Sequence, residues 1–273
     1  MFIKWNQKVV LLIVALLVMS GAAFATQRSQ ENVWDQVERT SLQQPGIDNS
    51  RMPAAYETFR LNKAALQALL ARAPEEFAGG TAVILSLPMP DGSYQRFSIE
   101  HSLVVERGLI DKYPELGATY RGFGIDDPTA FVRLDFLPSG FHSMLFTQNG
   151  TVMVDPYAKG DTDNYISYYK HDKPREGSGL HCEVKGDDTF EPITTPKGFD
   201  LTDILPTFVA PPQSSPDVIS GTQLRTYRLA LAGNNEYCSA VGGNTVAGCL
   251  AAMVLVMNRV NGVYERDVAI RMV

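Results

Sequence analysis

Residues 131–154 read FVRLDFLPSGFHSMLFTQNGTVMV, and this stretch decides the fold of the larger part of the chain. Apolar side chains at 132, 134 and 136 alternate with Arg133 and Asp135, which is the period of a strand with one buried face. Turn-forming residues interrupt the pattern twice, at 138–140 (Pro-Ser-Gly) and at 149–150 (Asn-Gly). The stretch therefore predicts three consecutive antiparallel strands.

Upstream of these strands the sequence predicts a hairpin and one helix. Residues 82–87 and 94–99 have strand patterns, and residues 88–92 between them are turn-forming. Asn62 is a helix-capping residue type, and leucines at 66, 69 and 70 share one face of a helix that we expect to end near Arg72. Together these patterns predict a β-rich antiparallel unit over residues 56–169.

Downstream the composition changes twice. Residues 170–221 contain seven prolines among polar residues, a density that predicts an inter-domain linker. Residues 222–273 predict a strand at 224–231, an apolar helix at 245–260 capped by Asn244 or Thr245, and a second strand from 268. This βαβ order is the start of an α/β unit. We expect an α+β chain, in which a β-rich antiparallel unit precedes an incomplete α/β unit.

The N-terminus has the layout of a secretory signal peptide at residues 1–25. Lys4 and Lys8 precede an apolar run from Val9 to Met19, and small residues at Ala23 and Ala25 suit cleavage before Thr26. The run is short for a membrane span. We therefore expect an exported protein, periplasmic or extracellular, with residues 26–55 as a flexible leader because they are polar and lack a period.

The charge pattern argues against two classes of partner. The net charge is −6 and the pI is about 5.3, without the clusters of Lys and Arg that neutralise nucleic-acid phosphates. After the signal peptide the nearest candidate for a membrane span is 248–257, and Asn258-Arg259 ends it too early. We expect neither nucleic-acid binding nor membrane attachment after signal cleavage.

Three cysteines enter an oxidising compartment if the chain is exported, so at most one pair forms. Cys238 follows the first predicted strand of the second unit, and Cys249 lies in the first turns of the next helix. Because that helix packs back beside the strand, we expect a Cys238–Cys249 disulfide. Cys182, in the linker, is then either a buried or bonded cysteine or a free thiolate that ligates a metal.

Local motifs supply no catalytic site. The four histidines (His101, His142, His171 and His181) lie far apart in sequence, and the chain has no His-Glu-x-x-His, no nucleophile elbow and no phosphate-binding loop. Asp126-Asp127-Pro128 and Asp161-x-Asp163 resemble calcium-binding loops. Short acidic loops are more often solvated turns, which is our expectation here.

Several stretches resemble bacterial reprolysin-like (adamalysin-type) zinc metalloproteases of the metzincin group. The most specific one is Val260–Asp267, with the sequence VNGVYERD. The other stretches that resemble the start of the family's catalytic domain are Leu224–Leu231, Asn235–Tyr237, Thr245–Gly248, Met257–Arg259 and Val268–Val273. Those that resemble its pro-region are Phe59–Asn62, Leu87–Gly92, Gly124–Pro128 and Asp155–Tyr157.

The resemblance implies a secreted zinc endopeptidase precursor that acts on proteins or peptides. Residues 56–169 would be a pro-domain that contacts its own catalytic domain, and 222–273 the start of that domain. The family's zinc motif, His-Glu-x-x-His-x-x-Gly-x-x-His, is not in this sequence. We therefore expect zinc only in a full-length enzyme, no hydrolysis by these residues, and Cys182 as a latency ligand of that zinc.

Two other readings come from different classes of protein. One is a non-catalytic exported binding module, with the β-rich unit as its working part. The other is a free-standing pro-domain that inhibits a protease. A coding sequence that continues past Val273 into a zinc motif would separate the first reading from both.

Overall fold

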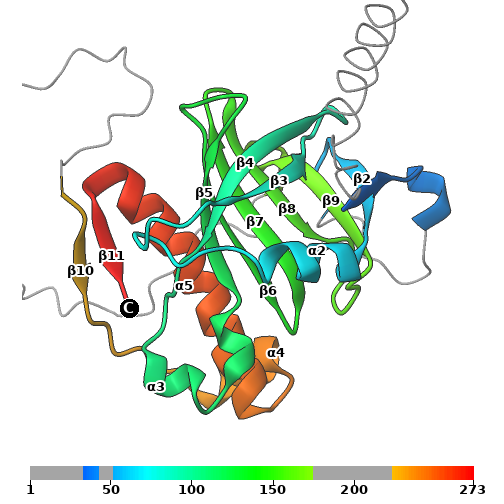
Figure 1. Ribbon diagram of the computed structural model, residues 1–273. Helices are drawn as coiled ribbons and strands as arrows, with labels where there is room; N and C mark the ends of the chain where they lie inside the picture. The colour runs from blue at the N-terminus through cyan, green and yellow to red at the C-terminus, as the bar shows by residue number, and fades with distance from the viewer. Residues whose placement is uncertain (1–32, 43–51, 175–222) are drawn as a thin grey trace, which may run out of the picture.

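The antiparallel sheet predicted from residues 131–154 is present, and it is larger than that stretch alone indicates (Figure 1). The computed structural model describes residues 33–42, 52–174 and 223–273. Within them, nine strands form one sheet in the order β1-β2-β9-β8-β7-β6-β5-β4-β3. The strands are β1 (Trp34–Gln36), β2 (Glu57–Leu61), β3 (Val83–Pro88), β4 (Tyr94–His101), β5 (Thr119–Gly124), β6 (Phe131–Leu137), β7 (Gly140–Thr147), β8 (Gly150–Pro156) and β9 (Asn164–Tyr169).

The sheet curls until its two ends lie close together. The Ser167 hydroxyl of β9 donates a hydrogen bond to the Pro88 carbonyl of β3 at 2.8 Å. The Phe59 ring of β2 meets the Tyr94 ring of β4 edge-on, with centroids 5.9 Å apart. Because successive side chains on a strand point to opposite faces, one set fills the inside of this nearly closed sheet. Val132 and Leu134 belong to that inner set and are fully buried.

Helix α2 (Lys63–Leu70) packs its apolar face into the same core, as the leucine spacing predicts. Its cap is the predicted one, since the Asn62 side chain accepts a hydrogen bond from the backbone N–H of Ala65 at 3.1 Å. Shorter helical segments occupy the connections; they are η1 (Arg39–Leu42), α3 (Arg107–Ile110), η3 (Pro114–Gly117) and η4 (Lys170–Asp172).

The prediction of a flexible leader is wrong for its described part. Strand β1 pairs antiparallel with β2, and the Trp34 side chain is 1% exposed. Its indole packs edge-on against Phe141 and Tyr165, with ring centroids 5.2 Å and 5.4 Å away. A three-residue strand is too short to show a period, so the surrounding polar residues concealed it. The signal peptide at 1–25 and the rest of the leader up to residue 32 lie outside the described residues, as do 175–221 of the predicted linker.

Strand β5 was not predicted because its sequence, TYRGFG, breaks the alternation with two glycines. The packing explains both. A Cβ on Gly122 would lie 2.4 Å from Cδ1 of Ile99, and one on Gly124 would lie 2.0 Å from the Asp127 carbonyl oxygen. Neighbouring atoms leave no space for a side chain at either position. Glycine therefore stands where a strand pattern would have an apolar residue.

The C-terminal segment forms the predicted strand–helix–strand order. Strands β10 (Arg225–Tyr227) and β11 (Ile270–Met272) pair in parallel, with helix α5 (Val246–Val268) between them in sequence. A further helix, α4 (Asn235–Gly242), was not predicted; Asn234 caps it by accepting from the Tyr237 N–H at 2.9 Å. Thr245 caps α5 and accepts from the Gly248 N–H at 3.0 Å.

Helix α5 continues eight residues past its predicted end at Val260. It does not lie apart from the sheet but packs along its outer face, so residues 223–273 and 52–174 are in contact (Figure 1). Among the described residues, α5 is the one helix long and apolar enough to cross a membrane by length and composition. Its buried residues are Cys249, Ala251, Val254, Asn258, Asn261 and Gly262.

Candidate functional site

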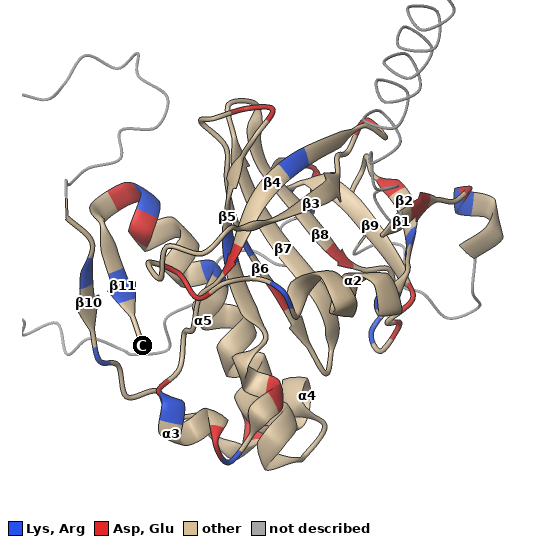
Figure 2. Ribbon diagram, viewed as in Figure 1, with Lys and Arg blue, Asp and Glu red and all other residues tan. Residues whose placement is uncertain are grey.

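The contact between α5 and the outer face of β6, β7 and β8 is the most elaborate feature of the described residues. Alternation along β6 turns Val132 and Leu134 inward, so Arg133 and Asp135 point outward. Both charged residues are nevertheless only 1% exposed, because α5 covers them. Figure 2 shows charged residues of both signs on the strands that α5 crosses and on the last turns of α5.

One group of charges joins the C-terminal end of α5 to the sheet; we call it the Glu265 network. The Glu265 carboxylate accepts from the guanidinium groups of Arg133 on β6 and Arg271 on β11. Arg271 also donates to Glu76, whose second oxygen lies 3.2 Å from Nε of Arg121 on β5. Five charged residues from five parts of the chain thus meet with their side chains at most 13% exposed.

Burial of Arg133 has an electrostatic cost. Desolvation lowers the pKa of its guanidinium to about 10, and Arg271 pushes in the same direction. Glu265 and Glu76 oppose the shift without cancelling it. For Arg271 the balance is reversed: burial lowers its pKa, but Glu265 and Glu76 outweigh burial and hold the pKa above the usual range. Arg133 is therefore the residue that most needs Glu265.

A second group of charges lies about two turns earlier on α5; we call it the Asp155 network. Arg259 of α5 pairs with Asp155 on β8, which also accepts from the Tyr168 hydroxyl at 2.7 Å. Burial raises the pKa of Asp155, but Arg259 and the other donors outweigh it and hold the pKa below the usual range. The amide of Asn258 adds bonds to the Leu134 carbonyl at 3.0 Å and to Asp135 at 3.1 Å.

The two networks have opposite polarity. In one the helix supplies the anion and the sheet the cation, and in the other the helix supplies the cation. The charged helical residues 259 and 265 are six apart, or about 9 Å along the axis at 1.5 Å per residue. A helix lying in the reverse direction would place like charges together, so the two networks fix both the direction and the register of α5.

Between the two networks α5 makes its closest approach. A Cβ on Gly262 would lie 3.0 Å from the Phe146 ring and 3.1 Å from Cγ of Arg133, so a larger residue would require these neighbours or the helix to shift by a few tenths of an ångström. Next to it, the Asn261 amide donates to the Met272 carbonyl at 2.7 Å and accepts from the Met272 N–H at 2.9 Å. This pair of bonds ties the helix to β11 and completes the strand–helix–strand unit.

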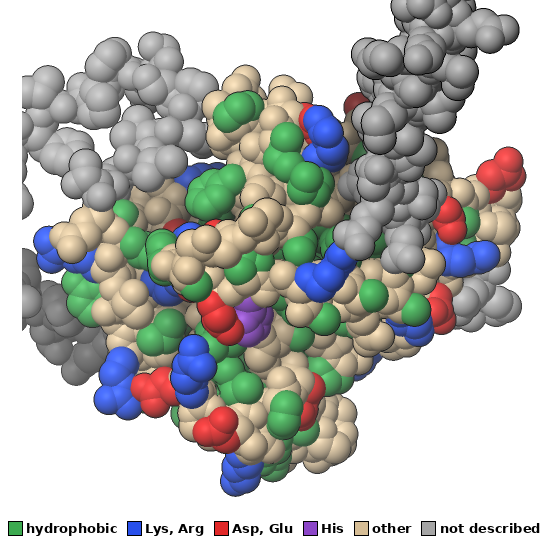
Figure 3. All heavy atoms as spheres, viewed as in Figure 1, with side chains coloured by type: hydrophobic (Ala, Val, Ile, Leu, Met, Phe, Trp, Pro, Cys, Tyr) green, Lys and Arg blue, Asp and Glu red, His purple; other side chains and the backbone are tan. Residues whose placement is uncertain are grey.

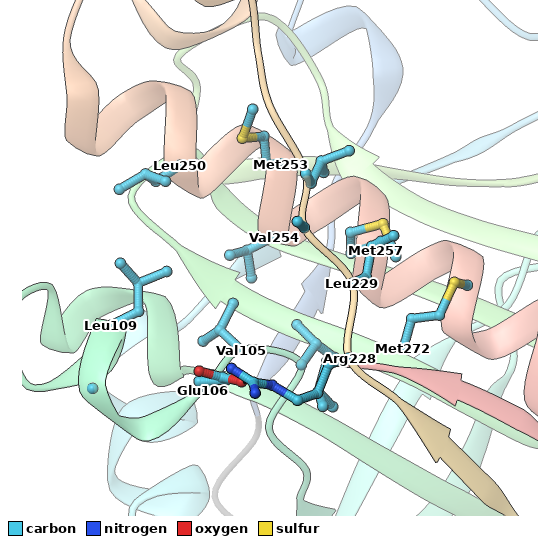
Figure 4. A pocket seen from close by; sticks show the side chains of 15 residues that line it. Val105, Glu106, Leu109, Arg228, Leu229, Leu250, Met253, Val254, Met257 and Met272 are labelled. Carbon is cyan, nitrogen blue, oxygen red and sulfur yellow. The ribbon is translucent and has the colours of Figure 1, made fainter.

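An apolar groove of about 490 Å³ lies between α5, the segment after β10 and the start of α3 (Figure 4). Valine, leucine and methionine side chains line it, and the Arg228–Glu106 ion pair lies at its rim. On the face shown in Figure 3, hydrophobic side chains also reach the surface between α3 and the β10–β11 pair. The lining residues that carry the groove are Val104, Val105, Leu109, Leu229, Leu250, Met253, Val254, Met257 and Met272.

The cysteines predicted to pair are bonded in the structure. Cys238 of α4 and Cys249 of α5 form a disulfide with Cα atoms 4.8 Å apart. The bond fastens α4 to the first turn of α5, where the backbones also meet closely at Gly242. Cys182 and His181 lie outside the described residues.

The described histidines have structural partners. In His101 one ring nitrogen lies 2.9 Å from Glu75 and the other 2.5 Å from the Gly117 carbonyl oxygen. His142 lies 3.1 Å from Asp135, and the exposed ring of His171 stacks on Tyr169. Within residues 33–42, 52–174 and 223–273 no group of three His, Cys, Asp or Glu side chains is placed to hold a metal.

The acidic loops are turns held by their own hydrogen bonds. Asp126 pairs with Arg96 at 2.6 Å, and Asp127 accepts from the N–H and hydroxyl of Thr129 at 3.0 Å and 2.7 Å. Asp161 accepts from the N–H groups of Asp163 and Asn164, both at 2.9 Å. Asp127 and Asp161 thus have local partners of the kind that stabilises a turn, whereas Asp126 pairs with Arg96 on strand β4.

Sequence reasoning missed both ion networks. One available signal was that Arg133 and Asp135 lie on a strand whose neighbours are apolar on both faces. Charged residues in such surroundings are buried, and buried charges need partners, whereas solvent-facing charges do not. A second signal was the density of charge in residues 259–267, which share a helix with an apolar face.

Comparison with known proteins finds no matching family model and no matching curated protein. The function of the chain is therefore inferred from its residues and their geometry.

Proposed function

We propose that the chain is the N-terminal part of the precursor of an exported zinc endopeptidase. In this proposal residues 56–169 are the pro-domain, and residues 222–273 begin the catalytic domain. Peptide-bond hydrolysis belongs to the full-length enzyme, and proteins or peptides are its substrates.

One observation carries the proposal. The stretch with the most specific family resemblance, Val260–Asp267, contains the α5 residues that the sheet holds most closely, Gly262 and Glu265. A pro-region has to recognise its own catalytic domain, and buried pairs of opposite polarity supply that selectivity. The sheet therefore has the property that a pro-region requires, which is a surface made for this helix.

Buried ion pairs also suit a contact that must later open. Their attraction is largely offset by desolvation, so they specify an arrangement more than they strengthen it. Nε of Arg133 and Nε of Arg259 have no hydrogen-bond acceptor among the described protein atoms. These unmade hydrogen bonds further reduce the net stabilisation that the ion pairs provide. In the proposal, removal of the sheet leaves Glu265 and Arg259 free to be hydrated.

Zinc and Cys182 enter only through the full-length enzyme. Zinc would activate water for hydrolysis there, and the Cys182 thiolate would ligate it in the precursor. The described residues themselves do one thing in this proposal: they orient α5 and β11 before the rest of the domain folds around them.

The test is to read the coding sequence beyond Val273 and to assay the longest product. We expect a His-Glu-x-x-His-x-x-Gly-x-x-His motif within about 100–150 residues (about one domain length), stoichiometric zinc, and proteolysis that a chelator abolishes. Cys182→Ala in that product should give premature activity. A stop codon directly after Val273 would reject the proposal and favour an exported binding module or a free-standing inhibitor.

A further inference from the structure

A second hollow lies on the seam between the sheet and α5, away from the apolar groove. It has a volume of about 630 Å³ and is bounded by β8, β9, the η4 turn and α5. Its lining holds more basic side chains than that of the groove: Lys170, Lys173 and Arg259 contribute, together with Thr151 and His171 and beside the apolar surfaces of Met153, Tyr168 and Pro174. This is unexpected in a chain with a net charge of −6.

The two lysines are held on the same side of the hollow. Lys170 begins η4, a 3-10 turn, and the Lys173 N–H bonds back to the Lys170 carbonyl at 3.4 Å. Side chains three residues apart on a 3-10 turn are nearly eclipsed, so both ammonium groups project together. Neither lysine has an acidic partner among the described residues; Lys173 lies over the Tyr168 ring, with Nζ 5.6 Å from its centroid.

The single carboxylate in the lining does not neutralise these lysines. Asp155 already pairs with Arg259 and accepts the Tyr168 hydroxyl. The charges of Asp155 and Arg259 cancel, so the two lysines give the lining a local charge of +2; Asp172, between them on the turn, lies outside the lining and 3.6 Å from His171. Two like charges on one turn repel, and a dianion between them would remove that repulsion.

We propose that this hollow binds a phosphate group, either as inorganic phosphate or as a phosphate monoester. Lys170 and Lys173 would supply the charge, and the Thr151 hydroxyl and the His171 ring would donate hydrogen bonds to its oxygens. A tetrahedral dianion matches both the local charge and the number of donors, and the hollow has room for a small ester. This site is separate from the proposed protease chemistry and holds whether or not that proposal is correct.

Occupancy of the hollow would act on α5. Arg259 lines the hollow and at the same time holds α5 on β8 through Asp155. A bound dianion would attract Arg259 toward the same seam and oppose its departure. Phosphate therefore favours the docked helix by mass action, because Arg259 adds to its binding in the docked arrangement.

The experiment uses the full exported chain at constant ionic strength. Inorganic phosphate and glycerol phosphate are titrated by calorimetry against the native protein, Lys170→Ala/Lys173→Ala and the control Arg107→Ala/Lys112→Ala. Both double variants change the net charge by two, but Arg107 and Lys112 lie in and after α3, outside the hollow's lining. Circular dichroism checks that each variant is folded.

We expect at least tenfold weaker phosphate binding in Lys170→Ala/Lys173→Ala and less than twofold weakening in the control. Phosphate should also slow hydrogen exchange of the α5 amides near Arg259 in the native protein. Tighter binding of glycerol phosphate than of inorganic phosphate would identify an ester as the ligand, and the reverse order would identify the free ion. Equal losses in both double variants, or no binding by the native protein, would overturn the proposal.

Discussion

The inner and outer faces of strands β6–β8 are held by different means. Inside, Val132, Leu134 and Val154 are fully buried among other apolar side chains. Outside, a helix that begins more than 90 residues later buries Arg133 and Asp135 and partly covers Asp155. The inner face needs only apolar residues of suitable size, whereas the outer face needs specific partners at specific positions.

The comparison separates the contacts that hold the sheet together from those that hold α5 on the sheet. Apolar cores tolerate substitutions that conserve volume. A buried charge does not tolerate loss of its partner, because the remaining charge keeps its desolvation penalty. We therefore expect inner-face variants to unfold the whole molecule and outer-face variants to release α5 while the sheet persists.

The largest effect should follow from emptying the inner face. Trp34→Ala removes a fully buried indole that packs against Phe141 and Tyr165. We expect a loss of roughly 3–5 kcal/mol in the free energy of unfolding, measured by denaturant titration followed by far-UV circular dichroism. The exposed neighbour Glu38→Ala is the matched control and should change stability little. A small effect of Trp34→Ala would mean that β1 is not part of the core.

The next effect should come from the Glu265 network. Glu265→Gln keeps the shape of the side chain but removes the ion-pair partner of Arg133 and leaves Arg271 paired with Glu76 alone. We expect α5 to lose about 3 kcal/mol of protection, measured as faster hydrogen exchange of its amides, with β6 and β7 unchanged. Asp111→Asn, at the end of α3, removes one exposed negative charge and serves as the control. Equal loss of protection in the sheet strands would contradict the separation of the two faces.

The Asp155 network should show itself through pH. The pKa of Asp155 is lowered in the folded protein, so below about pH 4, its unfolded value, the unfolded state binds more protons than the native state. The stabilisation is therefore fully present above about pH 4 and is lost as pH falls through the folded pKa. Asp155→Asn should lower stability by about 2 kcal/mol at pH 7 and flatten the acid limb of a stability–pH curve. An unchanged acid limb would show that Asp155 is not a source of the acid sensitivity.

The smallest effects concern the helix caps. Two cap variants with the same expected loss of stability compare the inner core with the attachment of α5. Asn62→Ala and Thr245→Ala each remove one side-chain acceptor at a helix start, worth about 1 kcal/mol. The first should destabilise the whole fold, because α2 is part of the inner core. The second should increase exchange in α4 and the first turns of α5 alone. Residue-resolved hydrogen exchange on both variants distinguishes the two outcomes.

Local pattern predicted the inner face well. Alternation at 132–136, turn residues at 138–140 and 149–150, and the Asn62 cap each act over a few residues, and all appear in the structure. The parallel pairing of β10 with β11 also follows from the predicted strand–helix–strand order. The Cys238–Cys249 bond has a sequence separation of only 11, so local geometry was enough to suggest it.

The outer face could not be predicted in the same way. The strand period shows that Arg133 points away from Val132, but it does not show that Glu265 covers it 132 residues later. Trp34 was missed for the same reason, since its partners Phe141 and Tyr165 are more than 100 residues away. Burial of these residues depends on long-range contacts, whereas a period records only which side chains share a face.

Gly262 gives the attachment of α5 an all-or-none character. A slip of one residue turns a helix by about 100° and would bring the side chain of Val263 or Asn261 against Phe146 and Arg133, where even a single Cβ would lie only 3.0 Å and 3.1 Å from its neighbours. Registers of α5 on the sheet that are shifted by one residue are therefore disfavoured. The helix is either docked with both ion networks formed or detached with both broken. Breaking one network therefore also breaks the other, because both depend on the same docked helix.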